Sequence, residues 1–457
     1  MGKESIFKSK IGFGRQDITP SIGIYSRCWG AAISDCAKGI HKPLYATAMV
    51  MASGDGQEDL YVLVNFDGTL YANREDEWEM RKAVIDALGT NSAQVMIGVS
   101  HTHSVMFLSR DNADKPGGKW VVPYLNKIKE QIIEAVLEAR QNIENAYISW
   151  FKGSCDLATN RDLKDASSQR FITGYNPKVT ADETLVVGKV TSSEGDVLGI
   201  LVNYACHPTT LAWENELISP DYVGAMRETV EEQYPNALCL FLLGACGELA
   251  PAHQYTSDTD IADLHGRKLG FSVLGTMHGL SQSDELVFDR MQESGAPLAV
   301  WTLKKNKAYS EVLKSKVEQV PIKIKPDWQD HAQIKRELEQ ATDRVIQERL
   351  LRKLRVQQSL GDTNNFHLPV WIWRVGEAFF IGSPAEAYSI LQIELRKAFP
   401  NSTIIVMNLI NGANGYLPES HLYTEDIYTV WQTPFDQGGL EILIDTCKKT
   451  IQSMLHN

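Results

Sequence analysis

Short apolar runs rich in β-branched residues recur through the first 250 positions of this chain and restrict the folds open to it. Most of them lead into polar turns or helical stretches, and they occupy residues 60–66, 94–100, 184–190, 197–205 and 237–243. One amphipathic helix is clear, because apolar residues recur at spacings of three and four from Leu125 to Ala139. Strands alternating with helices predict an α/β fold. Since the alternation is not strict, we expect a mixed β-sheet core.

The segment at about 284–365 has a different character. Lysines crowd residues 304–325, and residues 330–360 set Ile334, Leu338 and Val345 at helical spacing among Arg, Gln and Glu. We expect a solvated helical insertion packed along one stripe, rather than a coil that binds a partner. Strand-like residues resume at 368–381 and 403–410, so the C-terminal third should complete the same core. The expectation is one large domain over residues 1–457.

Composition excludes several classes of protein. The 457 residues carry 57 acidic and 45 basic side chains, a net charge of −12, which argues against nucleic acid as a partner. No run approaches the roughly 18–20 apolar residues of a transmembrane span. The first five residues show no apolar leader, so we expect a cytoplasmic protein, with a periplasmic or secreted one open if a leader was removed. Oligomeric state stays open.

Cysteine usage restricts the choice of metal ligands. The chain has seven cysteines, an odd number, and none of them forms a CxxC pair. This pattern predicts neither a disulfide framework nor a thiolate zinc site, and it is typical of buried reduced thiols. A zinc ion would therefore need histidine, carboxylate or rarer ligands.

Two of the predicted strands end in histidine. Residues 94–99 run into Ser100-His101-Thr102-His103-Ser104, and residues 197–205 run into Cys206-His207-Pro208. The period of two in a strand places His101 and His103 on one face, and Pro208 ends the second strand beside His207. Converging imidazoles can bind a metal, or one can bind while another moves protons. Hydrogen-bonded structural histidines are the alternative.

Two further segments follow strands. Glu386 comes after a Gly/Pro turn and begins a helical pattern, where the helix dipole favours a carboxylate of either functional or structural kind. Residues 411–416 form a Gly/Asn-rich loop that either builds a site or is a turn. The HExxH, GxSxG and P-loop motifs are absent, and Gly12-Phe13-Gly14 lacks the third glycine of a dinucleotide fingerprint.

Taken in order, these motifs resemble the neutral/alkaline non-lysosomal ceramidase family. The resemblance runs over residues 14–418, in the blocks GRQDITP (14–20), GIHKPLYA (39–46), SHTHS (100–104), NR (160–161), ACHPT (205–209), residues 244–251, PAE (384–386) and GYLP (415–418).

What the resemblance implies is a zinc-dependent amidohydrolase of sphingolipid metabolism, acting on a lipid-like or small N-acyl substrate with one Zn²⁺ per chain. The implied metal ligands are His101, His207, Glu386 and Tyr416. The implied catalytic residues are the acid/base His103, the substrate-facing Arg161, and Tyr428, a second tyrosine twelve residues after Tyr416. Two imidazoles, a carboxylate and a phenol oxygen suit zinc and leave room for a reactive water.

Departures from the family pattern concern the substrate. Ala250 stands where the family has a serine, Thr429 where it has a glutamate, and the chain ends where the family continues into an immunoglobulin-like domain. We therefore expect long-chain ceramide to be a poor substrate. Two alternatives are a metal-dependent hydrolase or lyase of a polar, sugar-like substrate, with Trp29, Trp120 or Trp213 stacking on it, and a non-catalytic binding protein that retains the fold.

Overall fold

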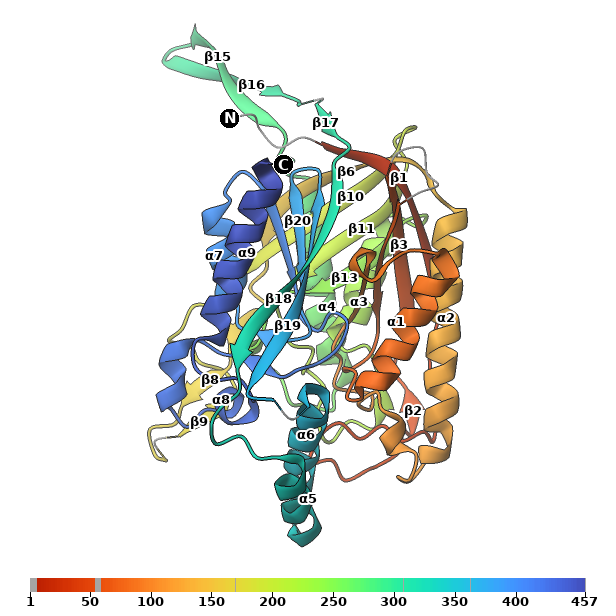
Figure 1. The fold of residues 1–457 in the computed structure, drawn as a ribbon. Helices are drawn as coiled ribbons and strands as arrows, with labels where there is room; N and C mark the ends of the chain where they lie inside the picture. The colour runs from red at the N-terminus through yellow and green to blue at the C-terminus, as the bar shows by residue number, and fades with distance from the viewer. Residues whose placement is uncertain (1–5, 54–58, 169, 307, 362, 457) are drawn as a thin grey trace.

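The computed structural model describes residues 6–53, 59–168, 170–306, 308–361 and 363–456 (Figure 1). Residues 1–5, on which the expectation of an absent leader rests, lie outside this range. Within the described ranges, none of the helices is long and apolar enough to cross a membrane.

A large mixed sheet forms the first half of the molecule. Its strands are antiparallel to their neighbours except at the two ends of the main strand order, where β13 lies parallel to β11 and β5 lies parallel to β4. The short β17 (Tyr309–Ser310) also pairs with β1. The order is β13 (Leu238–Leu243), β11 (Val197–Tyr204), β10 (Thr184–Ser192), β6 (Glu144–Ser154), β1 (Ile6–Asp17), β3 (Tyr45–Ser53), β4 (Asp59–Phe66) and β5 (Val95–Val99). The mixed α/β core predicted from the sequence is confirmed.

A second mixed sheet packs against the first. Its order is β18 (Leu313–Lys323), β19 (Asn365–Val375), β20 (Ala378–Gly382) and β22 (Thr403–Met407). Apolar side chains from both sheets form one buried cluster between them, in which Trp150 of β6 meets Phe380 of β20 with ring centroids 5.7 Å apart. The indole of Trp373 also reaches across, donating to Ala93 O at 2.7 Å. The sequence predicted one sheet, and the structure contains two that share a core.

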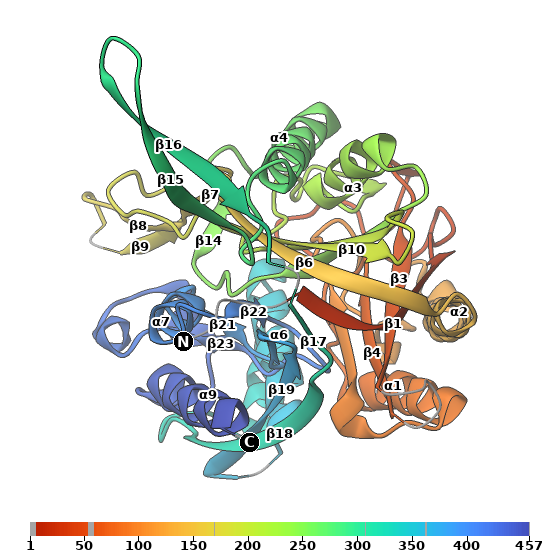
Figure 2. The same cartoon turned by 90° about the horizontal axis from the view of Figure 1, so that it is seen from above.

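Helices cover the outer faces of both sheets (Figure 2). On the first sheet lie α1 (Arg74–Leu88), α2 (Val121–Gln141), α3 (Tyr222–Gln233) and α4 (Thr259–Met277), and on the second lie α7 (Ile390–Ala398) and α9 (Gly439–His456). The result is a four-layer arrangement of helix, sheet, sheet and helix. Apolar residues therefore line both faces of the central strands, as in β3, where seven consecutive residues are buried.

The segment 284–365 is helical only in its second half. It begins with the hairpin β15 (Glu285–Glu293) and β16 (Pro297–Lys304), and continues through β17 into β18, which pairs with β19 along eleven residues. The lysines of β18 alternate with Leu313, Val317 and other inward-facing residues, a period-two pattern that the charge obscured in the sequence. The expected helix over 330–360 is two helices, α5 (His331–Gln340) and α6 (Arg344–Leu360).

Gly12 and Gly14 of β1 have a packing role. A Cβ added at Gly14 would stand 2.2 Å from Ala135 O, and one at Gly12 would stand 2.1 Å from Ala139 O. Both carbonyls belong to α2, so the two glycines let the helix lie directly on the strand. This contact accounts for the glycine pair without a nucleotide.

Replacement of Gly14 by alanine tests this contact. Gly14→Ala should lower the free energy of unfolding by about 1–3 kcal/mol, because α2 must move away from β1. Gly275→Ala is the matched control, since a Cβ at this position of α4 meets no atom within 4 Å. It should leave stability unchanged or raise it slightly. Urea unfolding midpoints measure both, and equal midpoints for the two variants would contradict the packing role.

Candidate metal centre

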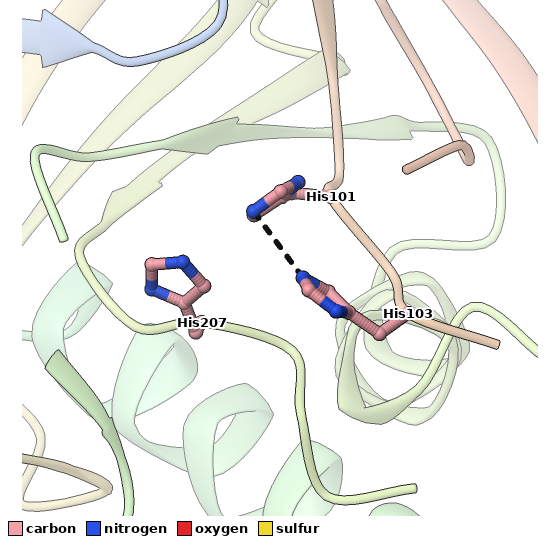
Figure 3. A group of neighbouring side chains, drawn as sticks. All are labelled: His101, His103 and His207. Carbon is pink, nitrogen blue, oxygen red and sulfur yellow. Dashed lines mark hydrogen bonds between the residues drawn. The ribbon is translucent and has the colours of Figure 1, made fainter. Parts of the chain in front are cut away.

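Three histidines from two loops converge at one end of the sheets. The imidazoles of His101, His103 and His207 face one another (Figure 3), and one nitrogen of each lies within 4.8 Å of the others. The rings of His101 and His207 have centroids 5.0 Å apart, and His103 Nε2 lies 3.3 Å from His101 Nε2. His101 and His207 are fully buried. The structure therefore brings together the histidines that the sequence singled out.

Backbone carbonyls fix the orientation of two of these rings. Nδ1 of His101 donates to Thr69 O at 2.6 Å, and Nδ1 of His207 donates to Cys246 O at 2.7 Å. A carbonyl oxygen only accepts, so Nδ1 carries the proton in both rings. In the neutral imidazole the lone pair then lies on Nε2, which points to the centre. Metal-binding histidines are commonly held in this way.

Glu386 completes a cluster of acceptors. Its Oε2 lies 3.2 Å from Nε2 of His207 and 3.4 Å from Nε2 of His101. Burial lowers the pKa of His207 to about 4, so this ring is neutral near pH 7. A carboxylate oxygen and an imidazole lone pair thus face each other, and a cation between them would relieve their repulsion.

The histidines reach the centre by a route different from the one predicted. Strand β5 ends at Val99, so His101 and His103 lie beyond it and the period of two does not apply. His101 instead has a φ of 66°, a left-handed conformation that is rare for a side chain with a Cβ. This turn brings the two rings together. A hydrogen bond from His103 N to Pro208 O joins this loop to the loop of His207.

Glu386 is not at a helix N-terminus, which corrects the prediction from the sequence. It lies in the short strand β21 (Glu386–Ala387), and α7 begins only at Ile390. Strand β21 pairs in parallel with β23 (Tyr416–Leu417), with Glu386 opposite Tyr416. The pairing of these two strands, rather than a helix dipole, sets the carboxylate beside the phenol.

Arg161 and Tyr428 extend the site beyond the acceptor cluster. Nη2 of Arg161, which is buried, donates to Gly247 O at 2.6 Å and to the hydroxyl of Tyr416 at 3.3 Å. Tyr428 begins α8 (Tyr428–Gln432), and its ring centroid lies 5.7 Å from that of Tyr416. All seven residues implied by the resemblance therefore belong to one connected group.

A pocket opens onto this group and has a wall that the sequence did not predict. Its empty space is about 680 Å³, including the part open to solvent, and its lining contains His101, His103, Glu386, Tyr416 and Tyr428. Arg352 and Arg355 of α6 line it as well. The sequence pattern of α6 predicts a solvated helix, whereas the structure places these two arginines in the pocket lining. The sequence signal for this wall was the spacing of three residues between Arg352 and Arg355, on a helix face that also carries apolar residues.

The two residues that depart from the family pattern are buried, and the hydroxyl of Thr429 has a hydrogen-bond partner. Ala250 is fully buried in β14 (Leu249–Pro251), which pairs with β7 (Ala158–Asn160) beside Arg161. Thr429 Oγ1 lies 2.5 Å from the hydroxyl of Tyr388, which donates to Asp162 at 2.8 Å.

Of the tryptophans considered as platforms for a sugar ring, two lie beside the histidines. Trp29 packs against His103 with ring centroids 5.2 Å apart, and Trp213 and Tyr255 pack against Trp29. Trp120, by contrast, is half-exposed at the start of α2. Trp29 therefore supports the ring of His103, and Trp213 and Tyr255 support Trp29.

Comparison with known proteins identifies the family. Residues 9–240 match the family described as neutral/alkaline non-lysosomal ceramidase, N-terminal. The chain belongs to this family.

Among curated relatives, neutral ceramidase 2 of Arabidopsis thaliana is 27% identical over 248 residues, which cover 51% of this chain and 31% of the relative. Neutral ceramidase 1 of the same plant is 25% identical over 240 residues, 49% of this chain and 29% of the relative. The matched region therefore spans about a third of the length of these family members.

Solved structures share the fold over nearly the whole chain. The crystal structure of neutral ceramidase from Pseudomonas aeruginosa has a TM-score of 0.69 at 16% identity, covering 97% of this chain and 73% of that one. A ceramidase complexed with C2 gives the same TM-score at 15% identity, covering 97% of this chain and 74% of that one.

The shifted pKa of His207 predicts how the metal-free protein responds to acid. Between about pH 6.5, the ordinary value for histidine, and the folded value of about 4, the unfolded chain binds a proton that the folded chain does not. The free energy of unfolding should fall as the pH falls through this window. His207→Gln should make the slope shallower by up to about one proton. Urea midpoints at several pH values in the presence of a chelator measure it, and equal slopes would contradict the prediction.

Proposed function

We propose that this protein is a zinc-dependent amidohydrolase that cleaves an N-acyl amide bond. The observation that carries the proposal is the acceptor cluster, in which His101, His207 and Glu386 direct two imidazole nitrogens and one carboxylate oxygen at a common point. Family membership supports amide hydrolysis as the reaction. The absence of this cluster would have favoured a non-catalytic binding protein.

The donor set fits zinc. Zinc prefers nitrogen and oxygen ligands of this kind in a four-coordinate site, and a catalytic site keeps one position for water. In the proposed set, His101, His207, Glu386 and Tyr416 hold the ion, of which we expect one per chain. When bound, zinc supplies an activated water at neutral pH and polarises the substrate carbonyl.

Three side chains then act on the substrate. Arg161 and Tyr428 stand beside Tyr416, where a cation and a phenol can stabilise negative charge on the carbonyl oxygen. His103 is the proposed acid/base: its Nε2, which points into the cluster, would take a proton from the attacking water and pass it to the leaving amine. Burial and the neighbouring imidazoles lower the pKa of His103 well below its usual value, so the ring is neutral before it takes up that proton.

The site also supports the proposal of one catalytic domain. The histidines follow strands of the first sheet, whereas Glu386 and Tyr416 follow strands of the second. Neither sheet alone contains the acceptor cluster. The protein is therefore proposed to work as one unit over residues 1–457, with the hairpin and helices of 284–365 attached to it.

Metal content and activity of histidine variants test the proposal. The purified protein should hold about one zinc per chain. His101→Ala should lose both metal and amidase activity, while His103→Ala should keep the metal and lose roughly 10²–10⁴ in kcat. His421→Ala is the control, because His421 is exposed in η4 (Ser420–Thr424), and it should change neither quantity.

Metal analysis together with hydrolysis of N-acyl amides measures these outcomes. Protein without zinc after expression in zinc-replete medium would refute the assignment of the metal. Retention of zinc by His101→Ala would refute the division of roles between the two histidines.

A further inference from the structure

Two arginines of α6 form one wall of the pocket. Arg352 and Arg355 both pack against Phe107, with their guanidinium carbons 5.0 Å and 5.4 Å from the ring centroid. Aromatic packing of this kind holds a guanidinium group flat and leaves its N–H edge free for an anion. The two side chains are one helical turn apart, so they face the same space.

Arg352 is held close to the catalytic group. It donates to Cys28 O at 2.6 Å and to the hydroxyl of Tyr428 at 3.3 Å, and it pairs with Glu348 at 3.3 Å. The thiol of Cys28 lies 3.6 Å from Nδ1 of His103. The wall is therefore separated from the proposed acid/base histidine by one residue.

Arg355 is partly buried and has no ion pair. Among the described residues it donates to Asn112 Oδ1 at 3.1 Å, while its buried Nη1 has no hydrogen-bond partner. Burial lowers the pKa of this guanidinium, although the more distant carboxylates of Glu348 and Asp111 act in the opposite direction. A desolvated guanidinium nitrogen without a partner is costly in a folded protein unless an acceptor arrives.

We infer that the substrate of this site carries an oxyanion, of carboxylate or phosphate type, which Arg355 and Arg352 bind beside the scissile amide. The inference rests on the proposed function for the reaction, but its binding step does not involve the metal. A neutral lipid amide would leave Nη1 of Arg355 without a charged partner, whereas an oxyanion accepts bidentate hydrogen bonds from a guanidinium. An N-acyl amino acid or the phosphate ester of an N-acyl amino alcohol has the required chemistry.

Binding to metal-free protein tests this inference apart from catalysis. Three probes share one acyl chain: N-hexanoylglycine, N-hexanoylphosphoethanolamine and the neutral N-hexanoylethanolamine. Calorimetry should show the carboxylate or the phosphate probe binding at least about tenfold more tightly than the neutral one, and the tighter of the two identifies the oxyanion. Arg355→Met should abolish this preference, and Arg355→Lys should keep part of it.

Arg349→Met is the matched control. It lies on the same helix, where its guanidinium stacks on Trp431 at 3.5 Å outside this pocket, so the preference should remain. If Arg355→Met does not fold, the Lys variant carries the comparison. Equal binding of charged and neutral probes, no binding of either anion at millimolar concentration, or an undiminished preference in Arg355→Met would overturn the inference. Loss of zinc or of hydrolysis alone would leave it standing and count against the proposed function.

Discussion

Contact between the two sheets is the interaction on which the site depends. The aromatic cluster between β6, β19 and β20 holds the sheets face to face, and the loops that leave their ends meet at one point. Each sheet supplies an incomplete set of ligands: histidines from the first and a carboxylate with a phenol from the second. A shift of one sheet relative to the other would separate these groups, so the packing of the apolar interior also sets the distances between polar atoms.

The backbone around the cluster adds a second level of control. Carbonyl oxygens of Thr69 and Cys246 hold two imidazoles in a single tautomer, and neither carbonyl belongs to the strand that carries its histidine. Because the rings are oriented from outside their own loops, the lone pairs are arranged before any ion arrives. This arrangement removes an entropic cost that flexible ligands would bring to metal binding.

Local pattern in the sequence predicted most elements and singled out the three histidines of the candidate site, but not their arrangement. The runs at 60–66 and 197–205 became β4 and β11, because apolar periodicity is a local signal. The division into two sheets depends on pairings between distant strands and was not visible. The left-handed turn at His101 replaced the predicted strand geometry, and β21–β23 pairing replaced a helix N-terminus at Glu386. Arg355 was missed because a charged residue on a helix looks solvated until the tertiary packing is known.

Residues 284–361 are one continuous stretch of chain that contributes to separate parts of the structure. One stretch of chain forms the hairpin β15–β16, then β18 along the edge of the second sheet, and then the helix that carries the arginine wall of the pocket. The proposed metal ligands all lie outside it. A change in this stretch can therefore alter what enters the pocket while the proposed hydrolytic centre stays the same. Diversification by exchange of one peripheral segment is the evolutionary route that this architecture favours.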